Sequence, residues 1–396
     1  MSVIGIICEF NPFHNGHKYL IDSVKKDGDT VVCVMSGNFV QRGESAIADK
    51  RIRAKAALLC GADLVIELPV AFAVSGAQTF ARGGVKLLDS LGCIDTIAFG
   101  SECGDTEKLK KAAKALNDSN VQNEINSFMQ TGITFAAARE NAVRKVFSDG
   151  IADILKNPND ILGVEYISAL NLLRSKIKPQ AVSRKSISHN SKMCNGAFAS
   201  AMLIREKMRN GEDYREFMPD KAFEVLQKAA EEGKIPSDYV KLEVAILAFL
   251  RKATAEDFKI VPDVSEGIEN RILASVRNAN TLSEVFDGAK TKRYTHARIR
   301  RIVLCAFLGI KKPHIACGMP YIHILGFSEN GRRLLHDAVK TATLPIAVRH
   351  SDISNLGYVA SQSYKLECTS TDIYNLTLPK IRNCGTEMTD SPAVVE

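Results

Sequence analysis

The sequence predicts an α/β protein in which a doubly wound parallel sheet is followed by a mostly α-helical second half. Two observations carry this prediction. Short, apolar, β-branched runs alternate with helical segments up to about residue 184, and strands that are apolar along their whole length are typical of parallel sheets covered on both faces. From about residue 196 these runs give way to helical spacing with polar faces.

Each apolar run of the first half is followed by a helix or a polar loop. Strands are predicted over 3–8, 30–36, 62–68, 95–102 and 178–184. Helices are predicted over about 15–26, 49–60 and 75–91, and a long polar loop, SGNFVQRGES, covers 36–45. Right-handed crossovers make such a sheet doubly wound. Ligands of these sheets bind outside the carboxyl ends of the strands, where the unusual polar stretches of this sequence fall.

The change of pattern predicts two domains and a tail. Residues 1–195 form the α/β domain and 196–385 a mostly helical domain, joined by the polar stretch SRKSISHNSKMCNG. Helices of the second domain are predicted in ASAMLIREKMRN, KAFEVLQKAAEEG, DYVKLEVAILAFLRK, ENRILASVRNA and HARIRRIVLCAFLG. The aperiodic tail at 386–396 is predicted to be disordered.

Composition narrows the class of protein. The 396 residues are 45% hydrophobic and 24% charged, as in soluble globular proteins. The ten cysteines contain no CxxC pair, which argues against a disulfide framework and a zinc site, so no metal ligands are predicted. The start MSVIGIICEF lacks a basic n-region and reads as a strand. The longest apolar runs are too short to span a bilayer, and we expect a cytoplasmic protein.

Positive charge is concentrated in one window. Between 290 and 349 there are twelve Lys or Arg residues and two acids, an excess of ten, whereas the whole chain carries only +7. A mildly acidic protein therefore carries one basic segment, and such segments most often meet phosphate-rich polymers. In KTKRYTHARIRR, Tyr294 and His296 alternate with basic residues and suit stacking on bases. A solvated basic helix face with no partner is the alternative interpretation.

The stretch EFNPFHNGHKYL follows the first strand and looks like a site. Asn11-Pro12 turns the chain, and Asn15 and Gly16 open a helix whose free N–H groups attract an anion. His14 and His17 lie three residues apart, so both can face the same way on the first turn. Histidines there can donate hydrogen bonds to phosphate oxygens during displacement at phosphorus. A purely structural corner remains the alternative at this point.

The motifs of this chain, taken in order, resemble those of a known family. HNGH fits the HxGH signature of the nucleotidyltransferase superfamily, whose catalytic domain is Rossmann-like (the HUP class) and acts on the α-phosphate of ATP. EFNPFHNGH, SGNFVQRGE, GADLVIELP, FGSE, PNDILGVEY and KRYTHARIRR occur in that order. Together they resemble the bacterial tRNA(Met) cytidine acetate ligase family, over nearly the whole chain.

The resemblance implies a function and a set of residues. It implies an enzyme that joins acetate to N4 of the wobble cytidine of elongator tRNA(Met) through acetyl-adenylate, with ATP as substrate, Mg2+ as its companion ion, and AMP and pyrophosphate as products. His14 and His17 would be catalytic. The implied ATP contacts are Ile7, Cys8, Glu9, Phe10, Asn11, Pro12, Phe13, His14, Asn15, Gly16, His17, Lys18, Tyr19, Leu20, Gly100, Asn159 and Arg184.

Three of these residues can also be explained by a structural role alone. Gly100 ends a predicted strand, where it could be a simple turn glycine. Asn159 is placed to cap a helix that starts near Ile161. Arg184 ends the last predicted strand, where a surface arginine is the alternative interpretation.

Other residues are weaker candidates. Arg42 could hold the leaving pyrophosphate, assisted by Lys50 or Arg53, although solvated helix-face charges are the plainer reading of the last two. His189 is a candidate near the tRNA entrance. The acetate pocket is expected near Phe10 or Phe39. The residues expected to contact tRNA are Lys290, Lys292, Arg293, Arg298, Arg300 and Arg301.

Two other functions stay open from the residues. An adenylyltransferase acting on a small phosphate-bearing metabolite would explain HNGH, but not the basic segment or the helical half. A non-catalytic tRNA-binding protein would explain the basic segment, but not the HNGH corner or the polar loop. The motifs show neither DNA binding nor membrane attachment, and they do not fix the oligomeric state.

Overall fold

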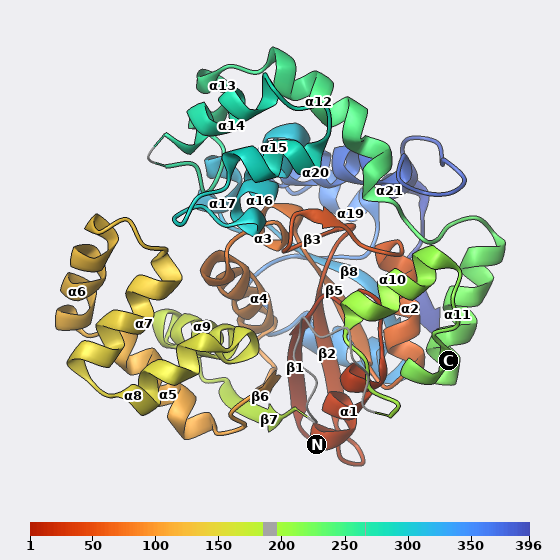
Figure 1. The fold of residues 1–396 in the computed structure, drawn as a ribbon. Coiled ribbons are helices and arrows are strands. Elements are labelled where there is room, and N and C mark those ends of the chain that lie inside the picture. Colours follow the sequence, from red (N-terminus) through yellow and green to blue (C-terminus); the bar gives the residue numbers. More distant parts are fainter. Residues whose placement is uncertain (185–195, 266) are drawn as a thin grey trace.

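The computed structural model describes residues 1–184, 196–265 and 267–396. One sheet runs through its centre, with the strand order β10-β8-β5-β2-β1-β6-β7 and β9 paired to β8 (Figure 1). Its strands are β1 (Val3–Cys8), β2 (Thr30–Ser36), β5 (Leu64–Leu68), β6 (Thr96–Ser101), β7 (Lys178–Ser183), β8 (Ile322–Ser328), β9 (Ile346–Ala347) and β10 (Ala393–Val395). A small hairpin, β3 (Phe39–Val40) and β4 (Glu44–Ser45), forms a separate sheet.

The strands predicted from the first half of the sequence are all present and parallel to one another. Their continuous apolar character follows from burial on both faces. Ile6 and Ile7 are neighbours in β1, yet they belong to two different hydrophobic cores because successive side chains point to opposite faces. The predicted fold class, a doubly wound sheet followed by helices, is confirmed.

Different helices cover the two faces of the sheet. The first face packs against α1 (Asn15–Val24) and α2 (Lys50–Leu59), with α11 (Asp220–Glu231) beside α2. The second face packs against α4 (Ala77–Leu91) and α9 (Pro158–Leu173). The crevice at the carboxyl ends of the strands is therefore bordered by helices from both faces.

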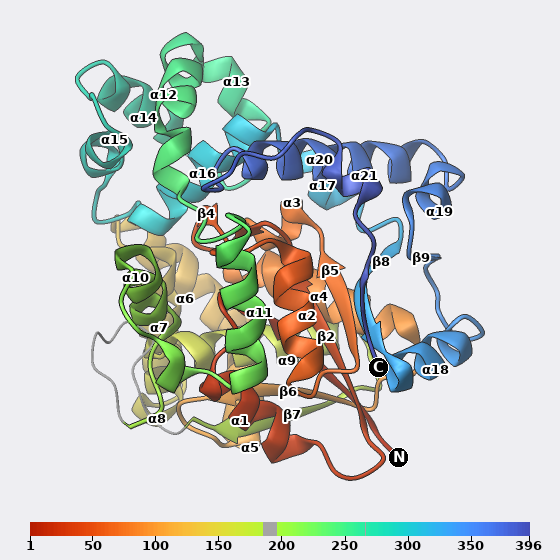
Figure 2. The ribbon, with the colours of Figure 1, turned by 90° about the vertical axis from the view of Figure 1, so that its right-hand side faces the viewer.

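The remaining helices come from two parts of the chain. Beyond α9 lie α5 (Thr106–Leu116), α6 (Ser119–Gln130), α7 (Phe135–Val146) and α8 (Asp149–Ala152). The second half of the chain supplies α10 (Ala201–Asn210), α12 (Glu243–Lys252), α13 (Ala255–Lys259), α14 (Ile268–Val276), α15 (Leu282–Ala289), α16 (His296–Leu308), α17 (Lys312–Ala316), α18 (Glu329–Ala338), α19 (His350–Ser354), α20 (Tyr358–Asn375) and α21 (Thr386–Thr389). Figure 2 shows α12 to α16 and α20 above the carboxyl ends of the central strands.

The sheet contains strands that the sequence reading missed. IHILGFS, in the segment 196–385 predicted to be mostly helical, forms β8 and pairs antiparallel with β5. Residue Leu64 lies opposite Phe327 there, so the two strands are more than 250 positions apart in the chain. Local patterns carry no information on so distant a partner. The division of the chain at residue 195 therefore separates strands of one sheet.

The prediction of a disordered tail at 386–396 is wrong. The segment forms the short helix α21 and the strand β10, which runs parallel to β8. The Glu387 side chain is buried and bonds to Lys50. Burying and pairing this side chain fixes a segment that has no helical or strand periodicity of its own.

Smaller differences concern helix ends. The helix predicted over 75–91 begins at Ala77, after a separate short helix α3 (Val70–Ala73), and ends before Gly92, whose φ of 71° lies in the left-handed region. In the part of the chain that the structure describes, no helix combines the length and apolar character needed to cross a membrane.

Candidate active site

A cavity of about 450 Å3 opens at the carboxyl ends of β1 and β6, and its volume lies in the range of small-ligand sites. Its walls come from the β1–α1 corner, the turn between β3 and β4, the starts of α4 and α9, and parts of α10 and α16. Segments from both halves of the chain therefore build one site.

The β1–α1 corner is held in an unusual backbone conformation. Phe10 has a φ of 42°, which a residue other than glycine adopts only under tertiary constraint. The constraint is packing, because the Phe10 ring is buried with its centroid 4.9 Å from those of Phe13 and His17. The chain then starts α1 at Asn15, with its N-terminus beside the cavity.

The two histidines of this corner cap the helix that they begin. The Nδ1 atom of His14 accepts a hydrogen bond from the Gly16 amide (3.0 Å), and Nδ1 of His17 accepts from the His14 amide (3.2 Å). The rings stack with centroids 3.7 Å apart. Because each Nδ1 is an acceptor, a neutral ring carries its proton on Nε2. Both rings line the cavity, so the cap holds two imidazole side chains beside it at the start of the helix.

Acidic and basic groups meet beside the histidines. Glu9 Oε1 accepts from the Gln41 amide at 2.7 Å, and burial raises the pKa of this carboxyl. Arg205, from α10, donates to the Asn11 carbonyl (2.8 Å) and to Glu44 (3.3 Å). The cavity thus holds carboxylates and guanidinium groups side by side.

Sequence reasoning missed Arg205. Its side chain lines the cavity although it belongs to a helix read as amphipathic with polar faces. The signal that could have found it is spacing, since Arg205 lies four residues after Ala201 and three before the buried Met208, on the inward stripe of α10.

The three isolated ATP-contact residues expected from the sequence meet at the same wall. Gly100, Asn159 and Arg184 all line the cavity. The capping reading of Asn159 is wrong, because α9 starts at Pro158 with Asn157 as its N-cap. Asn159 instead donates to Glu102 Oε1 (2.6 Å) and accepts from Arg184 (3.4 Å), so its side chain positions Arg184 beside the cavity.

The expected ATP segment from Ile7 to Leu20 lies only partly on the cavity surface. The cavity is lined by Ile7, Cys8, Glu9, Phe10, Asn11, His14, His17 and Leu20, and a smaller adjoining one also by Gly16 and Tyr19. Phe13 is buried beneath the corner, and Lys18 pairs with Asp22 on the helix surface. Asn15 donates to the carbonyls of Ala197 and Glu216, which ties α1 to the second half.

Comparisons with known proteins agree with this geometry. The model of the HIGH nucleotidyl transferase family matches residues 1–388. A curated tRNA(Met) cytidine acetate ligase of Caldanaerobacter subterraneus subsp. tengcongensis is 41% identical over 385 residues, 95% of each chain. One of Acetivibrio thermocellus is 35% identical over 99% of each chain. This chain belongs to the tRNA(Met) cytidine acetate ligase family.

Solved structures of the tRNA(Met) cytidine acetate ligase family extend the comparison to the fold. The apo structure of Thermotoga maritima TmcAL matches with a TM-score of 0.95 at 33% identity, and covers 100% of both chains. The structure of the same protein bound with alpha-thio ATP matches with a TM-score of 0.93. The fold around the cavity is therefore that of a family member crystallised with an ATP analogue.

In this member of the tRNA(Met) cytidine acetate ligase family, two basic residues have a role that neither reading of the sequence foresaw. Arg53 is 1% exposed and donates to the carbonyls of Ala48 (2.9 Å), Glu9 (2.5 Å), Ser36 (3.0 Å) and Gly37. It satisfies carbonyl groups at the ends of β1 and β2 rather than facing solvent or a phosphate. Three of these four carbonyls lie 16 to 44 positions away in the sequence, so periodicity could not reveal the role.

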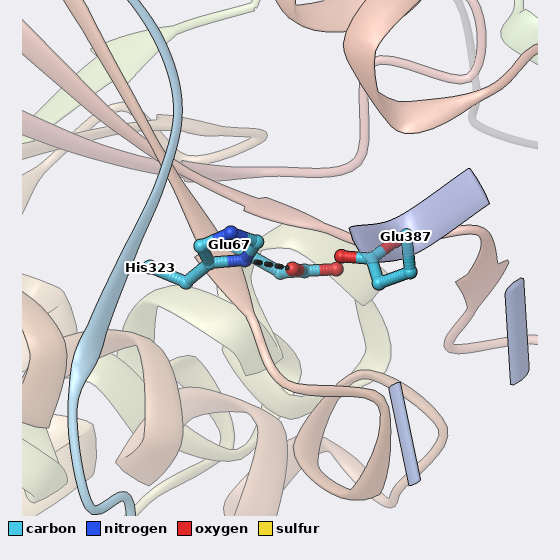
Figure 3. Close-up of side chains that lie close together, drawn as sticks. All are labelled: Glu67, His323 and Glu387. Carbon is cyan, nitrogen blue, oxygen red and sulfur yellow. Dashed lines mark hydrogen bonds and ion pairs between the residues drawn. The ribbon is translucent and has the colours of Figure 1, made fainter. Parts of the chain in front are cut away.

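Lys50 is also 1% exposed and belongs to a buried charge cluster. Its Nζ lies 2.5 Å from Glu67 Oε1 and 2.8 Å from Glu387 Oε1. Figure 3 shows Glu67 between His323 and Glu387. The Nδ1 atom of His323 lies 2.6 Å from Glu67 Oε2. Ligand atoms of Glu67, His323 and Glu387 gather within 4.8 Å of one another, as metal ligands do, but the Lys50 ammonium already supplies the cation there.

The two residues expected near the acetate pocket lie in different places. Phe10 lines the cavity, whereas Phe39 is fully buried with its ring 6.2 Å from that of Tyr374, away from the cavity walls. Phe39 is therefore not part of the cavity wall, and the place of the acetate pocket stays a prediction. Arg42 lines the cavity as expected, and His189 lies outside the described residues.

Residues of the basic segment differ in their surroundings: some are exposed, some contact neighbouring elements and one lines the cavity. Lys290 and Lys292 are exposed. Arg298 donates to the Asp263 carbonyl (2.9 Å), and the Arg300 guanidinium lies 5.5 Å from the centroid of the Phe286 ring. Arg301, from the same helix, lines the cavity.

The prediction that Tyr294 stacks on a base is wrong. Its ring is 5% exposed and packs in the core beneath the Arg298 guanidinium, which lies 5.2 Å from its centroid.

Proposed function

We propose that this chain is an ATP-dependent ligase that forms N4-acetylcytidine at the wobble position of elongator tRNA(Met) through acetyl-adenylate. The observation that carries the proposal is the histidine cap, which holds both imidazole rings in the cavity wall at the start of α1. Curated relatives that match along nearly their whole length carry the name of this activity.

In the first step an acetate oxygen attacks the α-phosphorus of ATP, and the bond to pyrophosphate breaks. Acetate is already anionic near neutral pH, so this step needs charge neutralisation rather than a base. His14, His17 and the start of α1 would hold phosphate oxygens, and Gly100, Asn159 and Arg184 would hold the rest of the nucleotide. Arg42 would bind the departing pyrophosphate.

The same cavity fits a magnesium ion. Glu9 and Glu44 bring carboxylate oxygens into it, and oxygen is the donor that Mg2+ requires. Bound there together with ATP, the ion would neutralise phosphate charge.

In the second step the N4 amine of cytidine attacks the acetyl carbonyl carbon. A new C–N bond forms, the bond from carbon to the AMP oxygen breaks, and the amine loses a proton. The amine is a weak nucleophile because its lone pair is delocalised into the ring, so the mixed anhydride must be held close to it.

The second substrate would reach the cavity from the side of α16. A wobble base lies in a single-stranded loop and can be splayed out without opening a duplex. We propose Lys290, Lys292, Arg293, Arg298 and Arg300 for contacts with the tRNA phosphates. Because tRNA is used in translation, we also propose that the protein acts in the cytoplasm.

Measuring the reaction products distinguishes this proposal from the two alternative functions, an adenylyltransferase and a non-catalytic tRNA-binding protein. We would measure AMP, pyrophosphate and labelled acceptor after incubation with ATP, magnesium, acetate and tRNA. The ligase releases both AMP and pyrophosphate, and its turnover continues only when acetate and tRNA are both present. An adenylyltransferase leaves AMP on its product, and a tRNA-binding protein releases neither.

A further inference from the structure

Helix α16 brings a side chain of the second half of the chain directly to the catalytic cavity. It lies close to the segment before α4, because Cys305 Sγ is 3.4 Å from the Val74 carbonyl. It also lies against the turn between β3 and β4, where a Cβ on Gly43 would be 2.8 Å from the backbone nitrogen of Arg301. Fixed at both places, α16 holds Arg301 in the cavity wall.

The guanidinium of Arg301 is oriented but only partly satisfied. Its side chain is 15% exposed, and its Nε lies 3.4 Å from Asp263 Oδ2. Among the described residues this carboxylate is the one partner that the guanidinium has, and it contacts the inner nitrogen. The two terminal nitrogens keep their donors for the cavity, where a planar fork of N–H groups matches a carboxylate or a phosphate.

The cavity that Arg301 lines also has an apolar wall. The α4 and α9 side of the site is lined by Phe80, Phe99 and Tyr166, and the rings of the last two lie 5.6 Å apart. His14 and His17 come from α1, which packs on the opposite face of the sheet. The cavity therefore has a hydrogen-bonding side at the α1 corner and an apolar side formed by these three rings.

We propose that Arg301 and this apolar wall form the acetate site, with the carboxylate on the guanidinium and the methyl group against the aromatic rings. The inference rests on the proposed function. Displacement at phosphorus requires the attacking and leaving oxygens roughly in line. Acetate held by Arg301 would therefore have to meet the α-phosphorus on the side away from the leaving pyrophosphate. Arg301 is then a substrate-binding residue rather than a tRNA contact.

The test is a kinetic comparison of full-length Arg301→Gln and Arg301→Lys with the wild type. Acetate, ATP and tRNA are each varied while the other two are saturating, and acetylated tRNA is measured. We expect Arg301→Gln to raise KM for acetate by about 10- to 100-fold, the effect of losing a charge-assisted hydrogen bond, with KM for ATP and tRNA within about twofold. Arg301→Lys keeps the charge but loses the fork, and should recover part of the loss.

Arg333→Gln is the matched control. Arg333 belongs to the same basic window, but it lies on α18 with its side chain 74% exposed, so all three KM values should be unchanged. A rise confined to KM for ATP would assign Arg301 to a phosphate and overturn the inference, as would a rise confined to KM for tRNA. Should Arg301→Gln fail to fold, Arg301→Lys alone decides by the same criterion. Absence of acetate-dependent turnover in the wild type would instead refute the proposed function itself.

Discussion

Lys50 and Glu387 are separated by 337 positions in the chain, yet they form an ion pair of 2.8 Å in which both side chains are at most 1% exposed. Glu67 completes the arrangement on the other side of the ammonium, at 2.5 Å. The Lys50 backbone amide also donates to Asn38 Oδ1. One residue therefore connects the last helix of the chain, the central sheet and the loop that carries Arg42 to the cavity.

Replacing Lys50 by methionine should strongly destabilise the protein. The substitution keeps most of the apolar volume but leaves two buried carboxylates without their cation, which costs about 3–5 kcal/mol of unfolding free energy. Denaturant titration followed by circular dichroism measures this loss. Lys110→Met is the control, since Lys110 pairs with Glu107 on the surface with its side chain 44% exposed, and it should cost no more than about 1 kcal/mol. Equal effects of the two variants would contradict the account.

Stability should fall in acid through Glu67. Burial raises the pKa of this carboxyl, but Lys50 and His323 outweigh burial and lower it to about 2. A carboxyl with a depressed folded-state pKa stabilises the fold above its unfolded pKa of about 4.3, and that contribution is lost as the pH falls toward the folded value. The difference in unfolding free energy between wild type and Glu67→Gln should therefore shrink from about pH 5 toward pH 2. A constant difference would exclude this linkage.

The catalytic role of His17 can be separated from its capping role. Asparagine at this position can accept the His14 amide in place of Nδ1 but has no group in place of Nε2. We expect His17→Asn to unfold at nearly the wild-type denaturant concentration while pyrophosphate release falls by about 10²- to 10³-fold. Binding of tRNA should be unchanged. Comparable losses of stability and of activity would mean that the ring serves the fold alone.

Much of the sheet and of this corner could be predicted from the sequence because the signals are local. The runs at 3–8 and 30–36 form strands with those same limits, and the HNGH spacing brings both histidines to the start of α1, His14 as its N-cap. Local signals fail where the partner is remote. The sequence favours surface positions for Arg53 and Lys50, whereas both side chains are buried. Their partners include the carbonyls of Glu9 and Gly37 and the Glu387 carboxylate, which lie far from them in the chain.

The basic segment is a second case in which the sequence alone does not predict which side chains face solvent. Its charge was evident, but charge alone does not tell which side chains face outward. Arg301 turns to the cavity because α16 packs against Val74 and Gly43, and Tyr294 turns into the core. The sequence of this segment alone does not show which of its side chains will pack against other elements.

Replacing Arg298 and Arg300 together by glutamine should weaken tRNA binding and its salt dependence. Each phosphate contact that is lost lowers the slope of log K against log salt by about 0.7 to 0.9. The double variant should therefore flatten the slope by about 1.5. Fluorescence titration of tRNA at several salt concentrations measures it. An unchanged slope would remove these two residues from the proposed interface.

The most direct measurement of the central claim is nucleoside mass spectrometry. The protein is incubated with ATP, magnesium, acetate and elongator tRNA(Met), without acetyl-CoA, and the digested tRNA is analysed. The account predicts an N4-acetylcytidine peak that requires both ATP and acetate, takes up the label of isotopic acetate, and is lost in His17→Asn. Pyrophosphate release without that peak would contradict the assigned acid or acceptor, and absence of both products would contradict the ligase function.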